Sequence, residues 1–367
     1  MALVTSLPQQ HYIATTIDGP TFPITRCLGR GFNGVVFEVM TSDGACAMKV
    51  NNPETYPADT AWREADLLLS VQKVRHVLRY LGRFVLTEIH YNGPDFQIDY
   101  TATKPLRVGI LTKLLPAKDT FDMYILPFAE GSRLSLEQIK ELCKQMCEAL
   151  NDLHEQGYYH GDVKPENTCF ARKLKLLDFG HARHVRDSMP DRPPGTLEYN
   201  SPECVLSTKY NQSIDLWSLG ATLFEYYTGY PLIPTEQELD DSQRIVDHMH
   251  LLRINMGGLP NDEIEASPWK DRLFSKKPDG TYGLSASPSD VARRIGHSHL
   301  VQLDRFGGMP VWQARIHYGA LRRKDSPEDA KRLIALIEPM LRYKNRITAA
   351  EVLRRLESSE ETLETKV

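Results

Sequence analysis

The chain has 367 residues, of which 41% are hydrophobic and 25% are charged, and its formal net charge is −4. This length allows one large domain or two lobes that share a cleft, and the composition is that of a globular protein. The net charge gives no sign of a nucleic-acid partner, and we expect none. The opening "MALVTSLPQQHYIATT" has no basic segment followed by an apolar run, and no later stretch approaches about eighteen uninterrupted apolar residues. We therefore expect an intracellular protein with no membrane partner.

The amino-terminal part predicts an antiparallel sheet with one helix. In "TFPITRCLGRGFNGVVFEVMTSDGACAMKV", apolar and β-branched runs are interrupted by glycines and by the hairpin signal Asp43-Gly44, which predicts three strands. The stretch "PADTAWREADLLLSVQKV" has apolar residues at helical spacing behind Pro57 and Asp59. Further on, "FQIDY" and "RVGILTK" predict two more strands, in a region whose purpose the sequence does not reveal.

The pattern changes to helices near residue 128. The stretch "SLEQIKELCKQMCEALNDLHEQG" begins with the N-cap residue Ser135 and closes with Gly157, and "SIDLWSLGATLFEYYTG" ends on Gly229 in the same way. Cys143 and Cys147 lie four residues apart on one face of the first helix, where a core position is expected. The six cysteines include no CxxC pair, so we expect free thiols.

A glycine fingerprint lies near the start of the chain, in "LGRGFNGVVF". Gly29, Gly31 and Gly34 stand between two predicted strands, whereas a dinucleotide-binding turn would lead into a helix. A β-hairpin with little side-chain bulk lets backbone N–H groups cover a triphosphate. The hairpin therefore predicts a nucleotide-binding flap.

Two charged residues follow the flap at a suggestive spacing. Lys49 ends the strand "CAMKV" among apolar neighbours, and Glu64 lies in the middle of the predicted helix. An ion pair between strand and helix would hold the Lys49 ammonium against the phosphates. The alternative for Glu64 is a solvated helix face.

The segment "YYHGDVKPENTCF", residues 158–170, supplies the residue types of phosphoryl transfer. Asp162 can accept a hydroxyl proton, and Lys164 can offset phosphate charge. Asn167 offers a neutral oxygen to a metal, and Asp178 in "KLKLLDFGHARH" offers a carboxylate. Mg²⁺ prefers such oxygen ligands, so these two residues are the candidate metal ligands.

In its order of motifs the chain resembles the eukaryotic protein kinase family, from about residue 22 to residue 355. The motifs are the glycine hairpin, "AMK", the helix glutamate, "HGDVKPEN", "DFG", "SPE" and "DLWSLG". The resemblance implies an α+β protein of two lobes, with a small β-rich amino-terminal lobe and a larger α-helical carboxyl-terminal lobe. ATP and Mg²⁺ are the implied cofactors.

The resemblance also divides the chain and assigns roles. The expected parts are an extension (1–20), an amino-terminal lobe (21–127, with an insertion at about 84–120), a carboxyl-terminal lobe (128–357, with an insertion at about 261–325) and a flexible tail (358–367). The implied catalytic residues are Asp162, Lys164, Lys49 and Glu64. The implied cofactor-binding residues are Gly29, Gly31, Gly34, Val36, Ala47, Lys49, Pro127 and Ala129.

The resemblance also implies roles in adenine binding and in holding the carboxyl-terminal lobe together. In "MYILPFAEG", Pro127 would use only its carbonyl, to accept from the adenine amino group, and Ala129 would supply the N–H for the ring nitrogen. Asp215 would brace the catalytic loop backbone. Glu203 would pair with Arg346.

The main departure from the family is Gly161, which stands where the catalytic loop usually carries arginine. In the family that arginine pairs with a phosphorylated activation loop, and it has no chemical role in transfer. We therefore predict an active kinase that does not need activation-loop phosphorylation. The alternative is an ATP-binding pseudokinase that acts as a scaffold.

Substrate features are read from three stretches. Lysine in "DVKPEN" is similar to the serine/threonine type, and "VDHMHLLRINMGGLP" resembles the CMGC branch, closest to its LAMMER and dual-specificity members. The pairs Thr196-Leu197 and Tyr199-Asn200 lack the arginines of that branch, although Thr196 should still contact the catalytic loop. An acidic patch suits a basic or Arg/Ser-rich protein substrate, or is a solvated loop; its members are Glu236, Glu238, Asp240 and Asp241.

Two remaining expectations concern partners. The terminal "TKV" matches the carboxylate motif read by PDZ domains, and a monomer is otherwise expected. A small-molecule kinase on the same fold is disfavoured by the "SPE" segment.

Overall fold

The structure is a computed structural model that describes residues 11–14, 19–94, 96–101, 106–115, 134–170, 173–187, 193–236, 238–301 and 309–364. The chain divides into two compact units, residues 1–119 and residues 120–367. The strand-rich first unit and helical second unit confirm the predicted α+β class.

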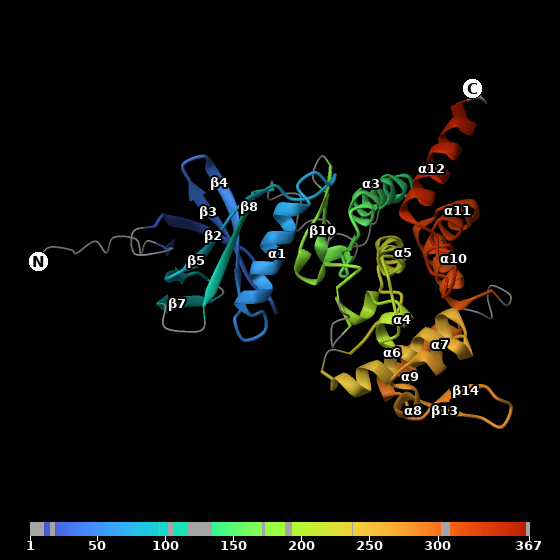
Figure 1. The fold of residues 1–367 in the computed structure, drawn as a ribbon. Helices are drawn as coiled ribbons and strands as arrows, with labels where there is room; N and C mark the ends of the chain where they lie inside the picture. The colour runs from blue at the N-terminus through green and yellow to red at the C-terminus, as the bar shows by residue number, and fades with distance from the viewer. Residues whose placement is uncertain are drawn as a thin grey trace, which may run out of the picture. The chain divides into compact units, whose positions relative to one another are not determined.

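The described part of the first unit forms one antiparallel sheet of eight strands in the order β5-β8-β4-β3-β2-β1-β6-β7 (Figure 1). The strands are β1 (Tyr12–Ala14), β2 (Thr21–Gly31), β3 (Gly34–Thr41), β4 (Gly44–Asn51), β5 (Tyr80–Leu86), β6 (Glu88–Asn92), β7 (Gln97–Thr101) and β8 (Arg107–Lys113). Helix α1 (Ala58–Ser70) packs against β5 and β8. The three strands and the helix predicted around the glycine hairpin are confirmed, as are the strands at "FQIDY" and "RVGILTK".

Strand β1 lies in the predicted extension and was not predicted. It pairs with β2 on one side and with β6 on the other, with Ile13 opposite both Phe22 and Ile89. Ile13 and Ile89 are fully buried. Residues Tyr12–Ala14 are therefore part of the sheet.

This sheet curls on itself. Phe37 of β3 and Tyr91 of β6 are three strands apart, which in a flat sheet means about 14 Å, yet their ring centroids lie 5.1 Å apart. The side chains of β1 and β6 consequently share one core with those of β2, β3, β4 and β8. The hairpin β6–β7, inside the predicted insertion, closes that core.

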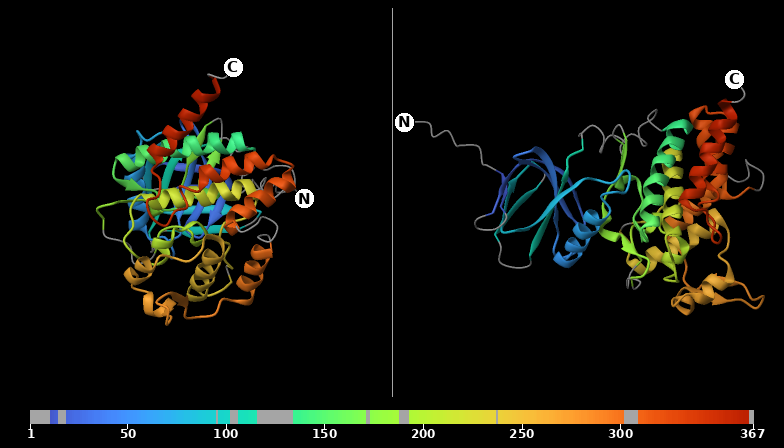
Figure 2. Two further views of the ribbon diagram at one scale, coloured as in Figure 1. Left: turned by 90° about the vertical axis from the view of Figure 1, so that its right-hand side faces the viewer. Right: turned by 45° about the horizontal axis from the view of Figure 1, so that its top comes forward.

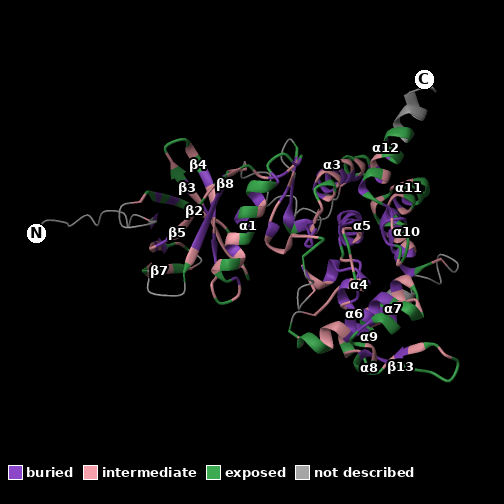
Figure 3. Cartoon of the chain, in the orientation of Figure 1, coloured by how far each residue is buried: buried purple, intermediate pink, exposed green. Residues whose placement is uncertain are grey.

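The second unit is organised around α5 (Ser213–Thr228), which is buried at every residue from Ile214 to Thr228 (Figure 3). A helix that is apolar nearly all round belongs in a core. Helix α3 (Leu136–Glu155) lies alongside it (Figure 2), and α10 (Val311–Arg323) and α11 (Pro327–Ile337) also pack against it. Gly229 ends α5 in a left-handed conformation, as predicted.

The remaining helices of this unit surround that centre. Ser135 is the N-cap of α3, as predicted, and Gln138 completes a capping box with it. The other α-helices among the described residues are α4 (Pro202–Val205), α6 (Asp241–Met256), α7 (Asn261–Ala266), α8 (Lys270–Leu273), α9 (Asp290–Val301) and α12 (Ala349–Glu364). The strands form the pairs β9 (Tyr158–Tyr159) with β12 (Arg183–His184), β10 (Thr168–Phe170) with β11 (Leu174–Leu176), and β13 (Phe274–Lys276) with β14 (Tyr282–Leu284). The predicted insertion at 261–325 thus contains regular structure.

All six cysteines lie among the described residues and are free thiols, as predicted, with Cys143 and Cys147 fully buried in α3. None of the helices in the described part of the chain has both the length and the apolar character that crossing a bilayer needs.

The buried position of Ile13 gives a test of strand β1. Replacing Ile13 by alanine should lower the free energy of unfolding by about 2–5 kcal/mol, because the cavity opens in a closed core. Urea unfolding measures this, and Phe32→Ala is the control, since Phe32 is 77% exposed and its loss should change stability by less than about 0.5 kcal/mol. Equal stability of Ile13→Ala and wild type would show that β1 does not belong to the folded sheet.

Candidate active site

The first unit contributes a lysine and a glutamate that pair as predicted. Strand β4 carries Lys49, and α1 carries Glu64; the Lys49 Nζ lies 2.9 Å from Glu64 Oε1 and 3.0 Å from Oε2. Tyr56 donates its hydroxyl to Glu64 Oε2 at 3.1 Å, and the Lys49 ammonium lies 5.1 Å from the Tyr56 ring centroid. Glu64 is buried, so the solvated-face interpretation is wrong. A paired, partly buried ammonium has the position and charge to bind a phosphate.

The glycines lie on a hairpin, as predicted. In β2 and β3, Gly29 pairs with Val36 and Gly31 with Gly34. Val36 in turn pairs with Lys49 in β4, which places the hairpin next to the ammonium. Ala47 lies on the same strand as Lys49, opposite Glu38. The predicted adenine-binding residues Pro127 and Ala129, together with Leu126, lie outside the described residues.

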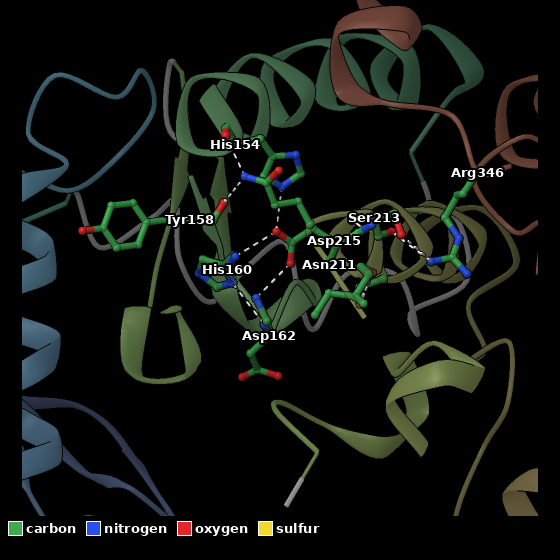
Figure 4. Close-up of polar contacts among 12 residues, drawn as sticks. His154, Tyr158, His160, Asp162, Asn211, Ser213, Asp215 and Arg346 are labelled. Carbon is green, nitrogen blue, oxygen red and sulfur yellow. Dashed lines mark hydrogen bonds and ion pairs between the residues drawn. The ribbon is translucent and has the colours of Figure 1, made fainter. Parts of the chain in front are cut away.

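The catalytic loop of the second unit is fixed by a buried carboxylate on α5 (Figure 4). Asp215 is fully buried; its Oδ2 accepts the backbone N–H of His160 at 2.8 Å, and its Oδ1 accepts that of Gly161 at 2.8 Å. The ring Nε2 of His154, on α3, lies 2.9 Å from Asp215 Oδ2. A buried carboxylate is stable only with such partners, so the loop and the helix hold each other. The predicted bracing role of Asp215 is confirmed.

His160 ties the loop to the strand that precedes Asp178. Its Nε2 lies 3.0 Å from the carbonyl oxygen of Leu177, and its Nδ1 accepts the backbone N–H of Asp162 at 3.2 Å. A carbonyl can only accept, so Nε2 carries the proton. Burial lowers the pKa of His160, despite the nearby carboxylates, and this favours the neutral ring.

Asp162 is oriented by hydrogen bonds to both carboxylate oxygens. Its Oδ1 accepts the Thr196 hydroxyl at 2.9 Å, and its Oδ2 accepts from the Asn167 amide at 2.8 Å and lies 3.0 Å from Lys164 Nζ. The Lys164 ammonium also donates to the Thr196 Oγ1 at 2.6 Å. The predicted contact of Thr196 with the catalytic loop is confirmed. A carboxylate held this way has a fixed direction, as general-base catalysis requires.

The two candidate metal ligands are neighbours in the fold. The backbone N–H of Leu177, next to Asp178, donates to the Asn167 carbonyl at 2.8 Å. Asn167 uses its amide nitrogen for Asp162, so its amide oxygen is the atom that could bind a metal. Asp178 accepts the Gly180 N–H at 3.1 Å and has a left-handed backbone, with φ of 55°. One amide and one carboxylate oxygen are donors that fit Mg²⁺, with phosphates and water completing the shell.

The ion pair between Glu203 and Arg346 is also confirmed. Arg346 Nη1 lies 2.5 Å from Glu203 Oε1, and Nη2 lies 3.2 Å from Oε2. Arg346 also donates to the Ser213 carbonyl at 3.1 Å (Figure 4). Its guanidinium carbon lies 5.2 Å from the Trp217 ring centroid. A bidentate pair buried at this depth joins α4, α5 and the chain before α12.

Sequence reasoning missed the histidines of this site. His154 lies near the end of a helix and His160 in a loop, and neither has a spacing that signals its partner. Their importance comes from a contact with Asp215, which is 61 residues from His154 and 55 from His160. Only the fold brings them together.

The chain is similar in sequence to known proteins. A family profile described as "Protein kinase domain" matches residues 22–356. A probable cell division protein kinase of Encephalitozoon cuniculi is 32% identical over 174 residues, which are 46% of this chain and 51% of the relative. Human MAPK/MAK/MRK overlapping kinase is 37% identical over 134 residues, which are 35% of this chain and 32% of the relative.

A third relative, human mitogen-activated protein kinase 13, is 35% identical over 153 residues, which are 38% of this chain and 42% of the relative. These relatives belong to the CMGC branch, as the sequence predicted. The chain spans about half of the length of these relatives, or less.

The burial of the Asp215 carboxylate predicts how much stability is lost when it is replaced by an amide. Asp215→Asn should lower the free energy of unfolding by about 1–3 kcal/mol, because the new NH₂ group must face a backbone N–H and leaves it unpaired. Urea unfolding measures the change. The exposed Asp241, whose nearest cation is Arg244 at 3.7 Å, gives the matched control Asp241→Asn, which should stay within about 0.5 kcal/mol of wild type. Equal effects at the two positions would contradict the bracing role.

Proposed function

The chain belongs to the protein kinase family, and on this premise we propose that it transfers the γ-phosphate of ATP to serine and threonine hydroxyls of proteins. The observation that carries the proposal is the orientation of Asp162 by Thr196, Asn167 and Lys164. The residues with a chemical role in the proposed transfer are all present, and the contacts of Lys49 with Glu64 and of Asp162 with Thr196 support those roles.

In the proposed mechanism, catalysis is mainly positioning and charge stabilisation. Asp162 accepts the hydrogen of the attacking hydroxyl and directs the oxygen toward phosphorus. Lys164, already next to Asp162, offsets charge on the transferring phosphoryl group. Asn167 and Asp178 would hold Mg²⁺ through their side-chain oxygens, and the bound ion would supply positive charge to offset that of the phosphates.

Lys49 binds the phosphates in this proposal, and Glu64 keeps its ammonium in place. Both residues of this pair belong to the first unit. Backbone N–H groups of Gly29, Gly31 and Gly34 would cover the phosphates, because the hairpin has no side chains at those positions.

We propose serine and threonine as acceptors because Lys164 and Thr196 form one hydrogen-bonded group with Asp162. This group is the one that "DVKPEN" loops of the serine/threonine type imply. CMGC relatives such as human mitogen-activated protein kinase 13 support the same assignment.

We further propose that transfer does not need a phosphorylated activation loop. Position 161 carries no side chain to receive a phosphate, and Thr196 already contacts Asp162 and Lys164. Asp162 is thus oriented by the side chains of Thr196, Asn167 and Lys164.

For the substrate we propose a basic protein segment, recognised by carboxylates near the catalytic loop. Glu225 on α5 is buried and accepts the Tyr199 hydroxyl at 2.6 Å. Burial raises the pKa of Glu225 to about 7, and the nearby charges of Glu166 and Glu198 contribute to the increase. The hydrogen bond from Tyr199 acts in the opposite direction and lowers the pKa. Glu166 is exposed at the surface. A substrate arginine or lysine would relieve the repulsion among these carboxylates.

The acidic patch expected from the sequence has another explanation. Asp240 is the N-cap of α6 and accepts from the backbone N–H groups of Ser242 and Gln243 at 2.9 and 3.1 Å. Asp241 lies in the first turn of the same helix. These positions favour helix capping over substrate recognition.

The transfer reaction is tested with ATP and Mg²⁺ on basic, acidic and Arg/Ser-rich proteins. Asp162→Asn should lower the transfer rate by about 10²- to 10⁴-fold, because general-base assistance is lost. Lys49→Met should weaken transfer to a similar extent, while leaving the Asp162 group intact. Incorporation of phosphate into protein is the measurement.

Two outcomes contradict this proposal. Unchanged incorporation in Asp162→Asn would show that the activity comes from another protein or another residue. ATP binding without incorporation into any of the proteins would favour the scaffold alternative.

The raised pKa of Glu225 predicts a pH dependence for basic substrates. Glu225 is mostly protonated at pH 6 and mostly ionised at pH 8, so its attraction for a cation grows across this range. The KM for an arginine-containing peptide should fall about threefold to tenfold between pH 6 and pH 8, relative to the same peptide with glutamine. Glu225→Gln keeps an acceptor for Tyr199 and should remove the difference. A difference that persists in Glu225→Gln would mean that another group binds the cation.

A further inference from the structure

The activation segment meets the catalytic loop at a contact between two glycines. Gly161 and Gly195 have φ angles of 76° and 75°, in the left-handed region. A Cβ on Gly195 would collide with the Gly161 carbonyl oxygen and lie 3.0 Å from Asp162 Oδ1. The two backbones therefore lie close together at this point, and Gly195 has no room for a side chain.

His181 lies next to this contact between the two glycines. His181 follows the turn of Asp178 and Gly180, and its ring Nδ1 accepts the backbone N–H of Gly195 at 3.1 Å. The carbonyl oxygen of the same His181 is the atom nearest to a Cβ built on Gly161, at 3.0 Å. His181 thus lies against both glycines.

The surroundings of the ring favour its neutral form, which is the form that can accept at Nδ1. Burial lowers the pKa of His181, and Lys164 and His160 lower it further, against Asp162 and Asp178. At neutral pH the Nδ1 atom of His181 is consequently free of a proton and can accept the Gly195 N–H.

Thr196 links the backbone position of Gly195 to the carboxylate of Asp162. Thr196 follows Gly195 directly and donates to Asp162 Oδ1 at 2.9 Å. Lys164 bonds to the same Thr196 hydroxyl. Fixing the Gly195 backbone therefore fixes the hydroxyl that orients Asp162.

We propose that His181 is a positioning residue that ties Gly195 to the turn after Asp178 and so holds Thr196 in place against Asp162 of the catalytic loop. This contact performs the task for which the family uses an arginine and a phosphate. This role rests on the proposed phosphoryl transfer, because His181 would hold the residues that orient Asp162 for that reaction.

The test compares two replacements of the ring. His181→Asn places an amide oxygen close to the position of Nδ1, so it keeps the acceptor, whereas His181→Leu keeps bulk without an acceptor. His181→Leu should lower kcat/KM for a protein substrate about threefold to tenfold, which corresponds to one lost hydrogen bond. His181→Asn should stay within about twofold of wild type by the same reasoning. The Kd for ATP should be equal in all three proteins.

A second measurement does not depend on activity. Hydrogen exchange of the Gly195 amide, followed in a peptide covering residues 193–199, should be slow in wild type and His181→Asn and fast in His181→Leu. If wild type transfers no phosphate but shows this exchange pattern, the proposed function fails and the positioning contact stands.

Other outcomes overturn the positioning role. Equal kcat/KM or equal Gly195 exchange in His181→Leu and wild type would show that the ring does not hold the segment. Equal losses in His181→Asn and His181→Leu would show that ring packing, rather than the acceptor, is what counts. Gly195→Ala, which forces a side chain against the Gly161 carbonyl, should lower kcat/KM at least as much as His181→Leu, and an unchanged rate would contradict the glycine contact.

Discussion

The carboxylate of Asp215 is the constraint on which the catalytic part of this protein depends. It is fully buried on a helix that is itself buried along nearly its whole length. A buried charge without partners would cost several kcal/mol, so its oxygens must meet donors. The donors are the backbone N–H groups of His160 and Gly161, which makes the shape of the loop a condition for a stable core.

This arrangement explains why the chain tolerates glycine at position 161. Asp215 holds the backbone of that residue, so the loop does not need a side chain there. The positive φ of Gly161 would cost another residue about 1–2 kcal/mol, and a Cβ would press against the His181 carbonyl.

The order of the motifs predicted those contacts in which both partners are motif residues. The pairs Lys49 with Glu64 and Glu203 with Arg346 could be named from the sequence because the family pattern assigns both members. Strand β1 could not, because three residues show no periodicity and its partner Ile89 lies far along the chain. His181 could not either, since its partner is a backbone N–H that only the folded chain presents.

We propose that contacts within the protein, rather than a phosphate, hold the catalytic loop in its active arrangement. The most direct test measures the rate of phosphate transfer by protein pretreated with a phosphatase, with mass spectrometry confirming that residues 182–200 carry no phosphate. The rate should be the same before and after treatment. A rate that falls with the phosphate content of this segment would contradict it.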